Sequence, residues 1–271
     1  MLIDDINFDQ TNLQIPSMDL IFWEAKLKNY CLVIPVINEG ERILNLLKKI
    51  KEHNLSDLID IIIVDGGSID GSLNVNTLKQ LDVRGLIIKR GEGKLSSQLR
   101  CAYSFAIEKG YIGILTIDGN DKDDPSAIPN FVDALNEGYD FIQASRFIEG
   151  GEASNTPFSR YFAIRFIHAP MLSLASGFKW TDTTQGFRGY SRRVLIDPNV
   201  APFRKIFCSY ELLAYLSYRI PKLGYKCKEL PTKRKYPTGE IPTKISLFKG
   251  NILVLAILVK ACLGFYNPRV K

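Results

Sequence analysis

Metal-binding sulfur and imidazole side chains are scarce in this chain. Its 271 residues include only two histidines, His53 and His168, and five cysteines that never form a Cys-x-x-Cys pair. Structural zinc sites need four such ligands, with cysteines or histidines paired at short spacings, so a zinc site of this kind is not expected. The odd number and wide separation of the cysteines indicate a reducing compartment. They are Cys31, Cys101, Cys208, Cys227 and Cys262.

Segments typical of export or membrane insertion are lacking too. Residues 1–30 are acidic and mixed in polarity, without the basic start and apolar core of a signal peptide. A strongly apolar run, residues 251–259, lies between Lys249 and Lys260 and is far shorter than the ~20 residues that span a bilayer. It is either a core helix or a helix that lies flat on a membrane with its lysines at the headgroups. We therefore expect a cytoplasmic protein, either free or at the inner face of a membrane.

Acidic residues become scarce after Pro202. Only Glu211, Glu229 and Glu240 occur there, among fourteen lysines and arginines, and the whole chain has a net charge of +6. This imbalance indicates an anionic partner, such as phosphates, lipid headgroups or nucleic acid. The alternative is an ordinary solvated basic surface. The overall composition, 46% hydrophobic and 24% charged, is that of a globular protein rather than a disordered one.

Short apolar runs alternate with segments of helical periodicity over the first ~145 residues. The runs at residues 31–34, 61–64, 86–88 and 114–117 are the expected strands. This alternation predicts an α/β fold, a mostly parallel sheet flanked by helices on both faces. We expect Asn38 and Asp124 to cap two of the helices. We divide the chain into an N-terminal extension (1–30), an α/β domain (31–245) and a C-terminal apolar and basic helix (246–271) that offers contact to a membrane surface.

A dense cluster of polar side chains follows the strand at residues 114–117. It begins at Asp118 and continues as Gly119-Asn120-Asp121-Lys122-Asp123-Asp124. Open α/β sheets bind ligands at the carboxyl ends of their strands. Because burying a lone carboxylate is costly, a cation or solvent is expected opposite Asp118. Asp124 is most simply a helix cap, and Asp121 and Asp123 are expected to be solvated loop charges.

Five motifs in order resemble the nucleotide-sugar domain of family 2 glycosyltransferases, which have the Rossmann-like GT-A fold. They are Val33 to Glu39, Ile63 to Ser72, Ile117 to Asn120, Ser145-Arg146-Phe147 and Asp182 to Arg188. The last two are similar to the dolichol-phosphate mannosyltransferase-like branch, which moves a sugar from a nucleotide onto a polyprenyl phosphate. The resemblance covers roughly residues 30 to 245.

The resemblance implies a role for each matching residue. Asp118 and Asn120 match the ends of an Asp-x-Asp motif that binds the diphosphate through Mg²⁺ or Mn²⁺. Gln185 and Arg188 would flank the sugar and diphosphate, and Glu211 matches an acidic residue on the next helix. The positions expected to line the nucleotide sugar are Pro35, Ile37, Glu39, Asp65, Gly67, Gly119 and Lys122. Lys94, which follows Gly91-Glu92-Gly93, is a further candidate for the nucleotide.

Two kinds of acceptor remain open at this stage. A hydroxyl acceptor needs a general base, and Asp182 is the candidate. A phosphate acceptor is already anionic and needs only positioning, for which Arg146 and Arg160 are the candidates because arginine matches phosphate oxygens. The stretch Lys233 to Glu240 resembles a flexible basic loop that closes over the diphosphate.

Three departures from the family pattern stand out. Gly66 replaces an aspartate that many relatives carry, and Asn120 replaces a charged metal ligand. Lys122 cannot bind a metal, but it could neutralise the diphosphate directly.

We predict an inverting, metal-assisted transferase that uses a UDP- or GDP-linked sugar and a polyprenyl phosphate in the synthesis of cell-envelope glycans. The alternatives are a hydroxyl acceptor on a surface glycan and a non-catalytic nucleotide-sugar binding protein. Nucleic acid is not an expected partner.

Overall fold

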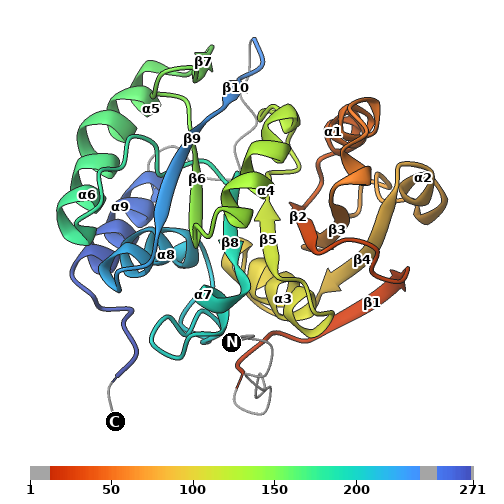
Figure 1. The fold of residues 1–271 in the computed structure, drawn as a ribbon, viewed down its shortest axis with the longest axis horizontal. Coiled ribbons are helices and arrows are strands. Elements are labelled where there is room, and N and C mark those ends of the chain that lie inside the picture. Colours follow the sequence, from red (N-terminus) through yellow and green to blue (C-terminus); the bar gives the residue numbers. More distant parts are fainter. Residues whose placement is uncertain (1–12, 239–248, 270–271) are drawn as a thin grey trace.

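A mixed β-sheet forms the centre of the molecule in the computed structural model, which describes residues 13–238 and 249–269 (Figure 1). Its strands lie in the order β1-β4-β3-β2-β5-β8-β6-β9. In chain order they are β1 (Met18–Trp23), β2 (Tyr30–Val36), β3 (Asp60–Asp65), β4 (Val83–Lys89), β5 (Gly113–Thr116), β6 (Phe141–Ser145), β8 (Arg188–Ser191) and β9 (Cys227–Pro231). β7 (Glu152–Ser154) and β10 (Lys233–Lys235) form a separate two-stranded parallel sheet.

Most strands of the large sheet run in one direction. β4, β3, β2 and β5 pair in parallel, as do β6 and β9. β8 is antiparallel to both β5 and β6, so those two strands share a direction. The edge strand β1 is antiparallel to β4. The predicted mostly parallel α/β sheet is therefore confirmed, with β1 and β8 as its antiparallel members.

Helices cover both faces of the sheet, as the sequence predicts. α1, α2 and α4 pack on one face, and α3, α6, α8 and α9 pack on the other (Figure 1). The helices are α1 (Glu41–Glu52), α2 (Val75–Gln80), α3 (Leu95–Glu108), α4 (Ile128–Asn136), α5 (Phe158–Ala163), α6 (Ala169–Ser176), α7 (Arg192–Ile196), α8 (Glu211–Lys222) and α9 (Lys249–Cys262). Shorter turns are η2 (Leu55–Asp57), η3 (Pro125–Ala127) and the π-helical η4 (Ile164–His168) between α5 and α6.

The two faces are sorted by the alternation of side chains along each strand. In β2, Leu32 and Ile34 face the α1 side, whereas Cys31 and Val33 face the α3 side, and all four are fully buried. Successive side chains of a strand point to opposite faces, so a strand covered on both faces reads as a continuous apolar run. This is why the strands were visible in the sequence.

The predicted boundary at residue 31 divides this sheet, because β1 lies within the expected N-terminal extension. β1 pairs with β4 from Met18 opposite Lys89 to Trp23 opposite Gly85. The ring of Trp23 packs edge-on against Phe105 of α3, with 5.1 Å between ring centroids. Residues 18–23 are therefore part of the domain that they were expected to precede. Their alternation is broken by a register shift between Leu20 and Phe22, which obscures the strand signal.

The apolar run at residues 251–259 is part of α9, which lies against α6 and α8. Leu258 and Ala261 are fully enclosed, so one face of α9 belongs to the core. Ile252 and Leu255 on the other face remain about half exposed, at 56% and 41%. No helix within residues 13–238 and 249–269 is long and apolar enough to cross a membrane. The first residues of the predicted C-terminal segment, 246–248, lie outside the described residues.

The cap predicted at Asn38 is wrong, whereas the cap predicted at Asp124 is confirmed. α1 starts at Glu41 after Gly40, and no side chain caps it. Asn38 adopts a left-handed conformation (φ 48°), and its Oδ1 accepts a hydrogen bond of 2.8 Å from the backbone N–H of Ile69. Its side chain therefore ties two loops at the sheet edge together instead of capping the helix. Asp124 accepts from the backbone N–H of Ser126 at 3.0 Å.

We predict that Trp23→Ala lowers the free energy of unfolding by about 3 kcal/mol, because it removes an aromatic ring packed between β1 and α3. Leu20→Ala in the same strand is the control, since this side chain is 49% exposed, and its expected cost is within about 0.5 kcal/mol. Urea denaturation measures both. Equal effects would contradict the assignment of β1 to the core sheet.

Candidate functional site

Loops from several parallel strands meet at the carboxyl edge of the large sheet. Loops follow β2 at Val36, β3 at Asp65 and β5 at Thr116. Asp118 lies two residues beyond β5 and is therefore held at this edge. Ligands of open α/β sheets bind at such an edge, so we built the candidate site from the side chains gathered there.

Two carboxylates predicted to contact the nucleotide also hold their own loops in shape. Asp65 is buried and accepts hydrogen bonds from the backbone N–H and hydroxyl of Ser68 at 2.9 and 2.6 Å. Glu39 forms an ion pair of 2.7 Å with Arg42. Gly67, in the loop between Asp65 and Ser68, has a φ of 99°, a conformation that favours glycine. These loops are thus ordered by local hydrogen bonds without a ligand.

Gly66 is explained by the packing behind it. A Cβ at this position would lie 2.9 Å from Nε2 of Gln98, which is too close. Gln98 donates hydrogen bonds to the carbonyl oxygens of Val36 and Val64, at 2.9 and 3.2 Å, and so joins the ends of β2 and β3. The aspartate of the family pattern is excluded here unless Gln98 moves. Nothing in the local sequence around Gly66 indicates Gln98 as its neighbour.

The cation opposite Asp118 is Arg234 of β10. Its Nη2 lies 3.2 Å from Asp118 Oδ2, and its Nη1 forms an ion pair with Asp123. Asp123 is 2% exposed, so its prediction as a solvated loop charge is wrong. Burial raises the pKa of Asp123, the nearby charge of Asp118 adds to this shift, and the charge of Arg234 opposes it. The ammonium of Lys122, the other cation considered from the sequence, lies 5.1 Å from the ring centroid of Tyr236.

Backbone hydrogen bonds attach β10 to the acidic loop. The N–H of Asp124 donates to the carbonyl of Lys233 at 3.0 Å, and the N–H of Lys235 donates to the carbonyl of Lys122 at 2.8 Å. On its other side β10 pairs with β7. The first part of the predicted flexible loop is therefore a strand, in which Arg234 alone points inward. Residues 239 and 240 of that loop lie outside the described residues.

Gly186 brings the Asp182-to-Arg188 loop directly against Asp118. A Cβ at position 186 would overlap Oδ1 of Asp118. Gly119 is similarly confined, because its Cβ would lie 3.0 Å from Val36 Cγ2. The glycines thus permit close approach of three loops. The resemblance placed these motifs in one site, and the structure brings them together.

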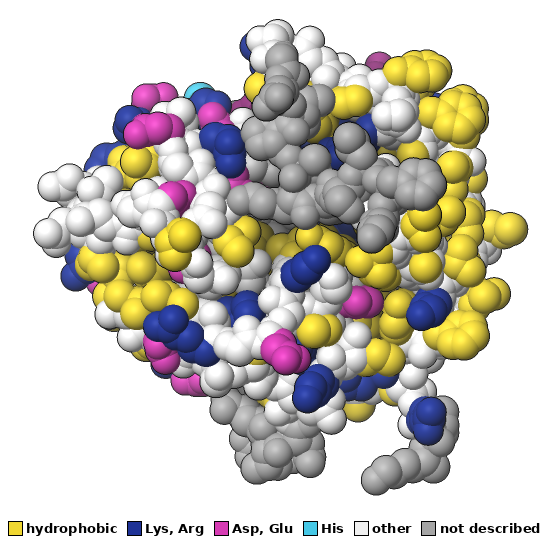
Figure 2. Space-filling model, turned by 180° about the vertical axis from the view of Figure 1, so that it is seen from behind, with side chains coloured by type: hydrophobic (Ala, Val, Ile, Leu, Met, Phe, Trp, Pro, Cys, Tyr) yellow, Lys and Arg dark blue, Asp and Glu magenta, His cyan; other side chains and the backbone are white. Residues whose placement is uncertain are grey.

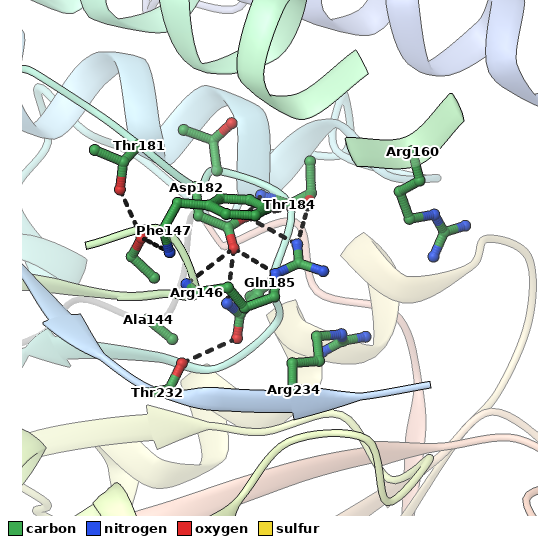
Figure 3. A network of polar contacts seen from close by, with 12 residues as sticks. Ala144, Arg146, Phe147, Arg160, Thr181, Asp182, Thr184, Gln185, Thr232 and Arg234 are labelled. Atoms are coloured by element: carbon green, nitrogen blue, oxygen red, sulfur yellow. Dashed lines mark hydrogen bonds and ion pairs between the residues drawn. The ribbon is translucent and has the colours of Figure 1, made fainter. Parts of the chain in front are cut away.

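Arg146 and Asp182 form a buried, bidentate ion pair beside the site (Figure 3). The two hydrogen bonds measure 2.7 and 3.1 Å, and Gln185 Nε2 donates a third to Asp182 at 2.7 Å. Burial alone would raise the pKa of Asp182, but the charge of Arg146 and these hydrogen bonds hold it below its ordinary value. A carboxylate stabilised in this way is a weak proton acceptor.

Four cations surround the buried ring of Tyr236. Arg160 and Arg146 each donate to its hydroxyl, at 3.0 and 3.5 Å. Lys122 Nζ lies 5.1 Å from the ring centroid, and the guanidinium carbon of Arg234 lies 5.6 Å from it. We call Lys122, Arg146, Arg160 and Arg234 the cation cluster. Figure 3 shows Arg160 on α5 and Arg234 on β10, on either side of the space next to the Arg146 guanidinium.

The cation cluster shifts the pKa values of the groups within it. Burial alone would raise the pKa of Tyr236, but Arg234, Arg160 and Arg146 lower it to about 8. Burial and the charge of Arg234 also lower the pKa of Lys122. Positive charge is therefore in excess here, a condition that favours binding of an anion.

Other predicted residues support the loops around the site. Arg188 is fully buried and donates hydrogen bonds to the carbonyl oxygens of Thr183 and Gln185, so it stabilises the conformation of the loop that precedes β8. Lys94 is exposed at the start of α3, with its ammonium 5.7 Å from the ring centroid of Tyr210. Glu211 accepts a hydrogen bond from the backbone N–H of Ser209. Pro35 is buried in β2, and Ile37 is 38% exposed in the loop that follows.

A divalent metal would have few protein ligands at this site. Within the described part of the chain, no three His, Cys, Asp or Glu side chains form a metal cluster. Asp118 offers one carboxylate, and the Oδ1 of Asn120 already accepts a hydrogen bond of 3.2 Å from the N–H of Lys122. Mg²⁺ sites commonly use one or two carboxylates and complete their shell with water and substrate phosphates. The residues therefore fit a metal that arrives with a diphosphate.

The chain is similar in sequence to known proteins. The family model described as "Glycosyl transferase family 2" matches residues 31–197. The polyprenol monophosphomannose synthase of Mycolicibacterium smegmatis is 25% identical over 74% of this chain and 75% of its own. The dolichyl-phosphate hexose transferase of Haloferax volcanii is 28% identical over 78% of this chain and 91% of its own.

The fold also matches a solved structure. Glucosyl-3-phosphoglycerate synthase from Mycobacterium tuberculosis superposes with a TM-score of 0.60 at 17% identity, over 86% of this chain and 79% of the synthase. At this identity the similarity concerns the fold. Other structures of that synthase contain UDP together with Mn²⁺ or Mg²⁺.

We predict that Gly186→Ala costs about 1–3 kcal/mol of stability, because the added methyl group overlaps the Asp118 carboxylate. In an Asp118→Ala background the same substitution should cost much less, since the obstructing oxygen is gone. Urea denaturation of the four proteins in this double-mutant cycle gives the coupling. An identical cost in both backgrounds would show that the two loops do not touch in solution.

Proposed function

The chain belongs to glycosyl transferase family 2, and on that premise we propose that it transfers a sugar from a nucleotide sugar to a polyprenyl phosphate with inversion at the sugar carbon. The observation that carries the proposal is the cation cluster around Tyr236, next to Asp118. A UDP- or GDP-linked sugar brings a diphosphate to this region. A phosphorylated acceptor brings a second anion.

The charges of the site suit two phosphate-bearing ligands. Four cations face three carboxylates, those of Asp118, Asp123 and Asp182, so the cluster keeps positive charge for a ligand. Three of the four are arginines, whose planar groups bind phosphate oxygens in pairs. Among the three arginines, Arg160 is the one that has no carboxylate among its described contacts. It is therefore our choice for the acceptor phosphate.

The state of Asp182 favours a phosphate acceptor over a hydroxyl acceptor. A hydroxyl group needs a base to remove its proton, and Asp182 is the candidate from the sequence. Its two carboxylate oxygens are already bound by Arg146 and Gln185, and its pKa is lowered. A phosphate acceptor needs no such base, because it is anionic near neutral pH. The two relatives, a polyprenol monophosphomannose synthase and a dolichyl-phosphate hexose transferase, support the same choice.

The proposed reaction is a direct displacement at the sugar carbon. An oxygen of the acceptor phosphate forms a bond to this carbon on the face opposite the leaving group. The bond from the carbon to the diphosphate breaks, and the nucleoside diphosphate leaves with the electron pair. Preorganised positive charge lowers the barrier because negative charge grows on the leaving group. Arg234 and Lys122 are the chain's own sources of that charge.

We propose that Asp118, with the amide oxygen of Asn120, holds Mg²⁺ or Mn²⁺ when a nucleotide sugar is bound. The metal would supply further positive charge at the leaving diphosphate. Asp118 is paired with Arg234 in this structure, so the metal and Arg234 compete for one carboxylate. The buried Asp123 remains as a partner for Arg234 when Asp118 is taken.

The proposal is tested by incubating the protein with UDP- and GDP-linked hexoses and a short-chain polyprenyl phosphate in detergent. We expect a sugar phospholipid and one nucleoside diphosphate per transfer. Arg160→Ala should raise the acceptor KM about tenfold or more, as expected for loss of a charge-assisted hydrogen bond. The donor KM should change less than about twofold, because the diphosphate is assigned to Arg234 and Lys122.

Arg90→Ala provides the matched control for that measurement. Arg90 is an exposed arginine that pairs with Asp19 at the edge of the sheet, so its loss should leave both KM values unchanged. Equal effects of Arg160→Ala on donor and acceptor would contradict the role of Arg160. Transfer to a glycan hydroxyl but not to polyprenyl phosphate would replace the proposed acceptor.

The competition at Asp118 predicts a measurable change in metal binding without nucleotide. The double variant Asp123→Asn/Arg234→Gln removes the competing cation and leaves no buried charge unpaired. It should bind Mn²⁺ about tenfold more tightly than the wild type, the effect expected from removing a charge-assisted hydrogen bond. Electron paramagnetic resonance of unbound Mn²⁺ measures the affinity directly.

Adding Asp118→Asn to that double variant should abolish the gain. An affinity that is the same with and without Arg234 would show that the guanidinium does not occupy the metal position.

A further inference from the structure

A stripe of exposed apolar side chains runs along the helical segment from α5 to α6. Its members recur every four residues: Phe158, Phe162, Phe166, Pro170 and Leu174. Phe158, Phe166 and Leu174 are 80%, 63% and 89% exposed. The rings of Phe162 and Phe166 stack at 4.9 Å, so the stripe is continuous at that point. Residues four apart lie on one side of a helix, so this is a single face rather than scattered side chains.

α9 presents a second stripe of the same kind. Ile252, Leu255, Val259 and Leu263 follow at helical spacing and are 56%, 41%, 37% and 68% exposed. The opposite face of α9, with Leu258, is buried against the protein. The helix therefore has one apolar face in the core and another apolar face turned to solvent. Solvent-facing positions on a helix of a globular protein are usually polar, so this second face needs an explanation.

The two stripes belong to one side of the molecule. α6 and α9 contact each other, and both rest on α8. Figure 2 shows hydrophobic side chains along the right-hand edge of the molecule. Because this view is turned by 180°, that edge is the left-hand side of Figure 1, where α5, α6 and α9 lie. We call the two stripes together the apolar face.

The segments that carry the apolar face contain no acidic residue. Residues 153–181 and 249–269 include neither Asp nor Glu, although at the chain's average of 29 acidic residues in 271 they would carry about five. Their basic residues are Arg160, Arg165, Lys179, Lys249, Lys260 and Arg269. Lys179, Lys260 and Arg269 are exposed. The two segments therefore contribute only neutral and positive side chains to this surface.

We propose that the apolar face docks on the surface of an anionic phospholipid bilayer. Exposed aromatic and aliphatic side chains insert at the boundary between headgroups and acyl chains, and nearby lysines and arginines attract anionic headgroups. The absence of acidic residues from these two segments distinguishes this surface from an ordinary protein interface, which carries charges of both signs at its rim. This inference rests on the proposed function, because a polyprenyl phosphate acceptor resides in a membrane and the protein must reach it there.

α5 links the apolar face to the cation cluster. Phe158 begins the apolar stripe, and Arg160, two residues later, donates to the hydroxyl of Tyr236 at 3.0 Å. Docking through Phe158 would thus bring Arg160 close to the headgroup layer. A lipid phosphate could then meet the cation cluster while its chain stays in the bilayer.

Vesicle co-sedimentation tests the docking with the full chain and no substrate. We expect the wild type to bind phosphatidylcholine vesicles containing phosphatidylglycerol more tightly than vesicles of phosphatidylcholine alone, and to lose this preference at high salt. Phe166→Ser with Leu174→Ser should weaken binding by roughly tenfold or more, because two large apolar groups no longer insert. Leu27→Ser, at a residue that is 60% exposed outside the apolar face, should have no effect.

A charge-reversal pair tests the electrostatic part of the docking. Lys260→Glu, on α9, should weaken binding to anionic vesicles by roughly fivefold or more. Lys48→Glu changes the net charge equally on α1, at an exposed lysine of the opposite sheet face, and should change binding little. Equal effects of the two would indicate attraction by net charge alone and would overturn the proposal. Circular dichroism confirms that the variants are folded.

Two further outcomes would overturn the docking surface. One is the absence of wild-type binding to anionic vesicles at low salt. The other is a concentration-dependent dimer that Phe166→Ser with Leu174→Ser dissociates, with no vesicle binding, which would make the face a contact between copies of the chain. Transfer to a detergent-dispersed acceptor separates the two proposals. If the proposed function is right, the docking variants should still transfer sugar to the detergent-dispersed acceptor. If no transfer occurs with any variant, the proposed function fails, but the vesicle measurements still test the docking surface.

Discussion

The paired contacts of Arg234 hold the candidate site in its observed form. Asp118 and Asp123 lie on one short loop, and Asp123 is almost inaccessible to water. Two carboxylates so placed would repel each other and resist burial without a cation between them. Arg234 supplies that cation from a strand more than a hundred residues away in the chain. The acidic loop, β10 and β7 then form one unit, and Tyr236 follows at its end with the other cations around it.

Features set by periodic apolar patterns or by local chemistry were predictable from the sequence. The strands at 31–34 and 114–117 are covered on both faces and stand out as apolar runs. Asp124 caps the turn that starts at Pro125. Aspartate favours the cap position and proline favours the first helical position, whatever the rest of the fold. The need for a cation opposite Asp118 was also predictable, because burying a carboxylate without a partner is costly.

Features that depend on distant partners were not predictable. In the sequence Asp123 looks like Asp121, but the structure pairs Asp121 with Lys49 and the buried Asp123 with Arg234. Lys122 was the nearer candidate to face Asp118, yet it packs on Tyr236. Gly66 reads as a lost ligand in the sequence, but in the fold it makes room for Gln98. In each case the local residue types were known and the missing information was the partner that the fold supplies.

The antiparallel strand β8 has a consequence for how the chain can assemble. It lies between β5 and β6, although β6 precedes it by more than forty residues in the sequence. β1 to β5 can pair with one another as soon as they leave the ribosome, whereas β6 must wait for β8 before it can join the sheet. The half that carries the acidic loop therefore has the contacts to fold early, and the half that carries Arg146 and Arg234 closes last. Asp123 can gain its guanidinium partner only after Arg234 has been synthesised, 111 residues later in the chain.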